Sequence, residues 1–110
     1  MGILIYISFS INYLILFLIN PGTPDKKYFL ENNLNESFQN SRICNICKIL
    51  IKNDEKIHHC EDCNICIIGY DHHCPWTSKC IGKGNIFYFN GMLIMVSFVF
   101  LYFIVCVLLI

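Results

Sequence analysis

The most apolar stretches of the chain lie at its two ends, and the polar positions lie between them. Residues 3–19 form a run of 17 mostly apolar residues, interrupted by two serines and an asparagine. Residues 92–110 form a run of 19 residues without a charge. A helix needs about 20 apolar residues to cross a bilayer, and a helix that is apolar on all sides does not suit the surface of a soluble protein. The pattern therefore predicts two transmembrane helices, at residues 1–19 and 86–110.

The N-terminal run has a second interpretation, because a cleaved signal peptide is also apolar and N-terminal. A signal peptide would carry a basic segment before the apolar run and small residues before the cleavage site, and neither precedes Asn20. The C-terminal run is still hydrophobic at Ile110, where the sequence stops. We therefore expect the chain to be a fragment of a longer protein or a divergent short form.

Residues 20–43 form a polar linker before the first cysteine of the middle region. Thr23 is followed by proline and aspartate, as at many helix N-termini, and Leu30, Leu34 and Phe38 recur every four residues. This spacing is typical of a short amphipathic helix on a membrane surface. The segment is also rich in asparagine, a poor helix former, so an irregular loop remains the alternative.

All 16 charged residues lie between Asp25 and Lys83, and Lys and Arg balance Asp and Glu at eight each. A chain without a basic excess is not expected to bind nucleic acid. All the basic residues fall between the two predicted helices, so the positive-inside rule places residues 20–85 in the cytosol. Asn35, in an Asn-Glu-Ser glycosylation sequon, would then carry no glycan.

Seven of the eight cysteines and all four histidines lie between residues 44 and 80. An odd number of cysteines in a reducing cytosol argues against a disulfide framework. Cys-x-x-Cys steps begin at Cys44, Cys60 and Cys63, and such a step lets two thiolates converge on one tetrahedral zinc ion. We therefore expect zinc. The eleven candidate ligands are Cys44, Cys47, His58, His59, Cys60, Cys63, Cys66, His72, His73, Cys74 and Cys80.

Two four-ligand zinc sites would use eight of these eleven groups and leave three. Cys74 has the most distinctive surroundings, because Asp71 and two histidines precede it and Pro75 and Trp76 follow it. A nucleophilic cysteine benefits from a base and from a group that orients the base. Cys74 is thus a candidate nucleophile, and the alternative is an unused or substitute metal ligand.

The run Asp-His-His-Cys-Pro-Trp at residues 71–76, inside this Cys-rich frame, resembles the DHHC protein S-acyltransferases, or palmitoyltransferases. The similarity continues through residues 80–82, Asn85 and Phe89, and residues 20–22 resemble a motif that follows the family's second span. The resemblance implies an α-helical membrane protein. Its two transmembrane helices in this chain would flank a small, irregular, β-hairpin-rich cytosolic domain, at residues 44–85, that binds two zinc ions.

The resemblance also assigns roles to individual residues. One structural Zn²⁺ would bind Cys44, Cys47, His59 and Cys66, and the other would bind Cys60, Cys63, His73 and Cys80. Cys74 would be the nucleophile, His72 the base that forms its thiolate, and Asp71 the group that orients His72. Trp76, Phe89 and His58 would contact the acyl chain or the coenzyme A part of the acyl-CoA co-substrate.

The implied reaction moves a palmitoyl or similar fatty acyl group from acyl-CoA, through a Cys74 thioester, to a cysteine of a substrate protein near the bilayer. The family usually has four spans and a Thr-Thr-x-Glu motif after the fourth, whereas this chain shows two spans and lacks that motif. The alternative is therefore a catalytically inactive membrane zinc module that serves as an adaptor or regulatory partner. A thiol redox protein is a third interpretation, which two bound zinc ions would exclude.

Overall fold

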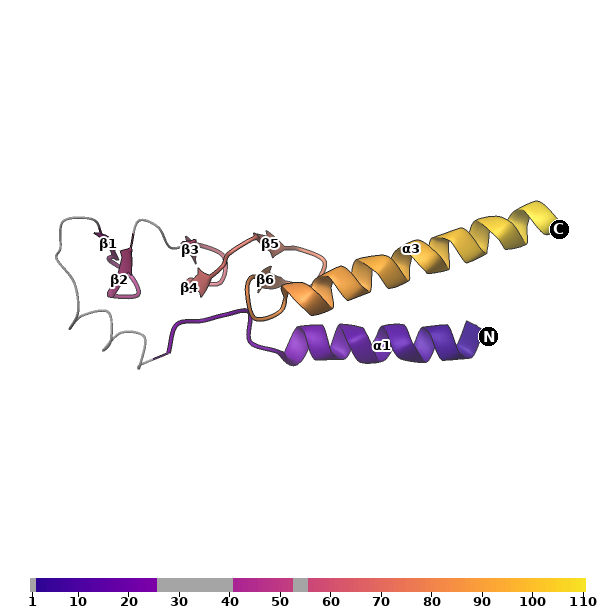
Figure 1. Ribbon diagram of the computed structural model, residues 1–110, viewed down its shortest axis with the longest axis horizontal. Coiled ribbons are helices and arrows are strands. Elements are labelled where there is room, and N and C mark those ends of the chain that lie inside the picture. The colour runs from indigo at the N-terminus through magenta and orange to yellow at the C-terminus, as the bar shows by residue number, and fades with distance from the viewer. Residues whose placement is uncertain (1, 26–40, 53–55) are drawn as a thin grey trace. The chain divides into compact units, whose positions relative to one another are not determined.

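The computed structural model describes residues 2–25, 41–52 and 56–110 (Figure 1). The chain divides into two compact units. One unit contains the two helices, α1 and α3. The other unit is Asn20–Gly84, which contains six short strands.

The helical unit consists of α1, Gly2–Leu18, and α3, Ile86–Leu109. The two helices pack against each other and bury Leu16 and Met92. Of the described helices, α3 alone is long and apolar enough to cross a membrane. With its 17 residues, α1 is apolar but shorter than such a span. One candidate span is therefore found where the sequence predicts two.

The polar unit contains three antiparallel hairpins, which follow one another along the chain (Figure 1). Hairpin 1 pairs β1, Ser41–Cys44, with β2, Ile49–Lys52. Hairpin 2 pairs β3, Ile57–Cys60, with β4, Ile65–Ile68. Hairpin 3 pairs β5, His72–Cys74, with β6, Lys79–Ile81. These pairs confirm the predicted small β-hairpins.

All three hairpins use the same turn. Each first strand ends on a cysteine, and the fourth residue after that cysteine has a left-handed backbone, with φ of 58° at Lys48, 55° at Asn64 and 49° at Ser78. The seventh residue after each cysteine is a buried isoleucine, at positions 51, 67 and 81. The polar unit is therefore a repeat of one short motif, at residues 41–52, 57–68 and 71–82.

The hydrophobic cores of the polar unit are small and include cysteines. Ile49, Ile51 and Ile57 pack with Cys66 in one cluster, and Ile67 packs with two further cysteines in another. A domain of this size buries too little apolar surface to be very stable on that basis alone. Bound metal is the usual additional source of stability.

Residues 20–25, which the sequence places in the polar linker, belong to the polar unit. The Ile68 amide donates to the Gly22 carbonyl at 2.8 Å, and the Gly84 amide donates to the Pro21 carbonyl at 3.1 Å. Gly22 has a φ of 114°, and a Cβ there would lie 3.0 Å from the Ile68 carbonyl oxygen, so a larger residue would be strained. Residues 23–25 are not helical. The remaining positions of the expected amphipathic helix, and the Asn35 sequon, lie outside the described residues.

Candidate functional site

Two groups of four Cys and His side chains stand out in the described part of the chain. Cluster 1 is Cys44, Cys47, His59 and Cys66, and cluster 2 is Cys60, Cys63, His73 and Cys80. In each cluster, the potential ligand atoms all lie within 4.8 Å of one another. The structure thus gathers the same two sets of four residues that the family resemblance implies.

The hairpin register explains why these residues meet. The turn of each of the first two hairpins contributes a Cys-x-x-Cys pair, and the next hairpin contributes a directly paired His and Cys from its two strands. These cross-strand pairs are His59 with Cys66 and His73 with Cys80. Directly opposed residues project to the same face of a hairpin. Each cluster therefore links one hairpin to the next.

The distances suit a tetrahedral zinc ion. In cluster 1, His59 Nδ1 lies 3.6 Å, 3.3 Å and 3.7 Å from the sulfurs of Cys44, Cys47 and Cys66. In cluster 2, His73 Nδ1 lies at the same three distances from Cys60, Cys63 and Cys80. Zn–S and Zn–N bonds of about 2.3 and 2.0 Å at tetrahedral angles place sulfur and nitrogen roughly 3.5 Å apart. Both clusters could hold a metal ion, and three thiols with one imidazole favour zinc.

The structure also brings Asp71, His72 and Cys74 together on hairpin 3. Asp71 Oδ2 lies 2.8 Å from His72 Nδ1, and the His72 ring makes a further hydrogen bond with the Cys74 thiol. Because Asp71 engages Nδ1, Nε2 is the ring nitrogen left for the sulfur. His72 and Cys74 lie two residues apart in β5 and so share one strand face, whereas His73 lies on the other face, with cluster 2.

The electrostatic environment favours a charged pair at this site. Burial alone would raise the pKa of the Cys74 thiol, but hydrogen bonds from Thr77, His72 and the Trp76 amide outweigh burial and hold that pKa below its usual value. Burial alone would lower the pKa of His72, but hydrogen bonds with Asp71 and Cys74 outweigh it and raise that pKa. Both shifts favour a thiolate beside an imidazolium, the reactive form of a Cys–His pair.

Thr77 is a further residue of the site, and the sequence motifs did not indicate it. This side chain is only 2% exposed and lies three residues after Cys74, the position that Cys47 and Cys63 occupy in the other two hairpins. Its amide donates to the Cys74 carbonyl at 3.3 Å, and its hydroxyl, 3.4 Å from that carbonyl, can donate its one hydrogen either to the carbonyl or to the Cys74 sulfur. An alignment of the three hairpins within this one sequence would have identified the position.

The three residues expected to contact acyl-CoA lie in different settings. Trp76 is at the tip of hairpin 3 and is 87% exposed. His58 is exposed in β3, and its ring lies 4.7 Å from that of Tyr70. Phe89 is half-buried in the first turns of α3.

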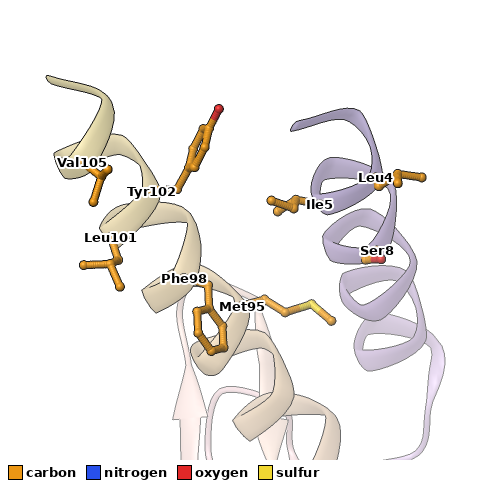
Figure 2. Close-up of a pocket in the computed structure, with 8 residues that line it drawn as sticks. All are labelled: Leu4, Ile5, Ser8, Met95, Phe98, Leu101, Tyr102 and Val105. Carbon is orange, nitrogen blue, oxygen red and sulfur yellow. The ribbon is translucent and has the colours of Figure 1, made fainter. Parts of the chain in front are cut away.

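The helical unit contains an apolar pocket with a volume of about 580 Å³. Figure 2 shows Ile5 of α1 and Met95 of α3 pointing into the space between the two helices. Phe89 is not among the residues that line it. The lining residues are Leu4, Ile5, Ser8, Met95, Phe98, Leu101, Tyr102 and Val105.

The two clusters and the Asp-His-His-Cys hairpin define a class of protein with a Cys/His-rich, metal-binding type of domain. Comparison with known families identifies the family. The family model described as DHHC palmitoyltransferase matches residues 37–110, about two thirds of the chain. The chain therefore belongs to the DHHC palmitoyltransferase family. Proteins of this family are membrane proteins, and α3 is the candidate span in this chain.

Individual relatives agree with this assignment. The chain is 41% identical over 81 residues to palmitoyltransferase ZDHHC17 of Homo sapiens, covering 74% of this chain and 12% of the relative. It is 32% identical over 87 residues to palmitoyltransferase PFA4 of Yarrowia lipolytica, covering 79% of this chain and 23% of the relative. The chain thus spans less than a quarter of the length of either protein.

Proposed function

We propose that the chain is the catalytic region of a protein S-acyltransferase, as a fragment or a divergent short form. It would move a palmitoyl or similar fatty acyl group from acyl-CoA to a cysteine of a substrate protein. The observation that carries this proposal is the connected set of Asp71, His72 and Cys74, with the 2.8 Å contact between Asp71 and His72 and the hydrogen bond from His72 to the Cys74 thiol. Relatives that are named palmitoyltransferases support it.

The proposed reaction has two thioester exchanges. In the first, the Cys74 sulfur attacks the acyl-CoA carbonyl carbon after giving its proton to His72 Nε2, and the carbon–sulfur bond to coenzyme A breaks. The imidazolium returns the proton to the departing coenzyme A thiolate. In the second exchange, His72 takes a proton from the substrate thiol, whose sulfur attacks the acyl-enzyme, and Cys74 regains its proton. Asp71 keeps the Nδ1 proton in place throughout, so Nε2 faces the reacting sulfur.

We assign structural roles to the two metal clusters. Cluster 1 and cluster 2 would each hold one Zn²⁺, which supplies a rigid cross-link between neighbouring hairpins when bound. His73 of cluster 2 lies between His72 and Cys74 in the sequence, so the cross-link would fix the strand that presents the catalytic pair. With four protein ligands each, neither zinc ion would have a position free for substrate.

We propose residues 1–19 and 86–110 as membrane segments and residues 44–85 as a zinc domain on the cytosolic side, with residues 20–43 as the linker. A palmitoyl chain has about 14 methylenes, and at about 0.8 kcal/mol each roughly 11 kcal/mol favours keeping it out of water. The apolar pocket of the helical unit supports a role in holding the chain, and Trp76, Phe89 and His58 are proposed acyl or coenzyme A contacts. A glycan on Asn35 after translation into membranes would contradict this orientation.

The test of the proposal is labelling of the purified, zinc-loaded chain in detergent with alkyne-tagged palmitoyl-CoA. We expect hydroxylamine-sensitive label on the unaltered chain and none on Cys74→Ser, with two zinc ions bound to both. Equal label on the two proteins would contradict the role of Cys74. Two bound zinc ions with no label on either would instead favour the adaptor or regulatory module.

A further inference from the structure

The three-hairpin repeat places Cys74 in a turn that twice elsewhere in the chain serves a metal cluster. Cys44, Cys60 and Cys74 each close the first strand of a hairpin and precede the same left-handed residue four positions on. The first two belong to clusters 1 and 2, and the third belongs to neither. Hairpin 3 therefore has the backbone of a metal-binding turn without a complete ligand set.

The hydrogen bonds to the sulfur are also the same in the three turns. In each hairpin, the amides of the second and third residues after the cysteine donate to its sulfur. In hairpin 1, the Cys47 amide lies 3.5 Å from the Cys44 sulfur. Hydrogen bonds of this kind orient a thiolate ligand and balance its charge. The Cys74 sulfur thus has the same amide donors as the two metal-binding sulfurs.

A second potential ligand lies beside Cys74. Asp71 accepts a hydrogen bond from His72 Nδ1 at 2.8 Å, so Nε2 is the ring nitrogen that faces the thiol and that can bind a metal once it has lost its proton. Metal-binding histidines generally donate the other ring N–H to such a partner, often a carboxylate. The His72 side chain is 38% exposed, which gives an ion a route to the pair from solvent. Sulfur and imidazole together suit a thiophilic divalent ion such as Zn²⁺ or Cd²⁺.

We propose that Cys74 and His72 form a third metal site, weaker than clusters 1 and 2, and that an ion bound there blocks acylation. Binding forms a metal–sulfur bond at Cys74 and a metal–nitrogen bond at His72 Nε2, and the one proton that the thiol and Nε2 share passes to solvent. Water completes the coordination. The site is weak because Thr77 occupies the position of the second turn cysteine, so the turn supplies one thiolate instead of two. This inference rests on the proposed function, because the inhibited reaction is the acylation of Cys74.

The experiment uses the full chain in detergent with both clusters loaded with zinc, and Cd²⁺ as the probe. Total zinc plus cadmium per chain is measured at a series of buffered free Cd²⁺ concentrations. We expect three ions on the unaltered chain and two on Cys74→Ser. In parallel, maleimide alkylation is mapped by mass spectrometry, and Cd²⁺ should protect Cys74 but leave Cys106, which belongs to neither cluster, at its original rate.

Substitutions at position 77 sharpen the test. Thr77→Cys restores the second turn cysteine and adds a protein ligand, whereas Thr77→Val keeps the shape of the side chain and adds none. Loss of an outer-shell partner alone changes metal affinity by roughly 10–100-fold. We therefore expect Thr77→Cys to lower the half-inhibiting Cd²⁺ concentration by at least about tenfold, relative to its own metal-free rate. Thr77→Val removes the hydroxyl hydrogen bond to the Cys74 thiol and adds no ligand, so it should raise that concentration, and a fall like that of Thr77→Cys would contradict the third site.

The outcomes separate this site from the proposed function. Equal metal content in the unaltered chain and Cys74→Ser, with no protection of Cys74, would overturn the third site even if acyl labelling succeeds. A third ion on a chain that shows no acyl label without Cd²⁺ would support the metal site and contradict the acyltransferase proposal.

Discussion

Hairpins 2 and 3 are two copies of one structure with different chemical roles. Each has a His-His-Cys strand end, a left-handed turn residue and a cross-strand His and Cys pair that belongs to the cluster of the preceding turn. They differ in the residue three positions after the first cysteine, which is Cys63 in hairpin 2 and Thr77 in hairpin 3. The comparison shows how a metal-binding turn can present a free thiol without a change of backbone.

The next element along the chain also distinguishes the two hairpins. The turn of hairpin 2 faces His73 and Cys80 of hairpin 3, which complete cluster 2. Hairpin 3 precedes α3, so within the described residues no later hairpin supplies it with a His and Cys pair. The Cys60 thiol thus gains three partner ligands, whereas Cys74 gains a single imidazole, which leaves its sulfur free for chemistry.

The largest difference between hairpins 2 and 3 is expected when their equivalent cysteines, Cys60 and Cys74, are replaced. Cys60→Ser removes a ligand of cluster 2, and because metal binding and folding are coupled in such domains, we expect bound zinc to fall from two ions to one or fewer. The polar unit should also lose its protection from proteolysis. Cys74→Ser should keep both zinc ions and the protection, and lose only the acyl label.

Zinc content of the two purified variants, with proteolysis as a second readout, checks this prediction. Loss of zinc from Cys74→Ser would mean that Cys74 is a structural ligand and that the two hairpins share one chemical role. Retention of two zinc ions by Cys60→Ser would remove Cys60 from cluster 2.

The adjacent histidines provide the second prediction. His73→Ala removes the imidazole of cluster 2, whereas His72→Ala leaves both clusters complete. General acid–base catalysis by one side chain contributes typically 10²–10⁴-fold, so we expect His72→Ala to slow acylation of Cys74 by about that factor with two zinc ions still bound. Rates of label formation in single turnover, measured beside zinc content, test this. An unchanged rate in His72→Ala would exclude His72 as the base.

The sequence alone predicts much of this site, because ligand spacing and a family motif are local features. Both clusters gather the residues that the resemblance implies, and Asp71, His72 and Cys74 meet as their sequence proximity suggests. The equivalence of the hairpins is harder to see, since the first cysteines are 16 and then 14 residues apart (60 − 44 and 74 − 60) and few positions are identical. The sequence motifs do not indicate Thr77 for this reason, because its importance comes from the position it shares with Cys47 and Cys63.

The two apolar end segments show a different limit of prediction from sequence. The uncharged C-terminal run is long enough to identify a candidate span without any structure, and α3 agrees with it. The N-terminal run is close to the minimum length, and α1 falls just short of it. Apolar composition alone does not distinguish a short transmembrane helix from a signal sequence or from a helix that packs against another helix. Whether α1 crosses a membrane therefore depends on residues outside the apolar run.

The third prediction tests whether equivalent core residues of hairpins 2 and 3 contribute equally to the free energy of unfolding. Ile67 and Ile81 occupy equivalent positions in hairpins 2 and 3, and both are fully buried. Ile→Val typically costs 0.5–1.5 kcal/mol at a buried site. We expect each variant to lose about 1 kcal/mol of zinc-loaded stability, measured by denaturant unfolding of the polar unit in the full chain. A much larger loss at one position would show that the two hairpins pack differently despite their common register.

The smallest expected effect concerns the left-handed turn residues, Asn64 and Ser78. A left-handed backbone costs most L-residues roughly 1–2 kcal/mol, whereas asparagine adopts it more readily and glycine adopts it without strain. Ser78→Gly should therefore stabilise hairpin 3 by about 0.5 kcal/mol after the entropy that glycine loses on folding, and Asn64→Gly should change stability little. The same denaturant measurement checks both. Destabilisation by Ser78→Gly would mean that the serine side chain contributes more than its backbone strain removes, and the turn of hairpin 3 would then be held differently from that of hairpin 2.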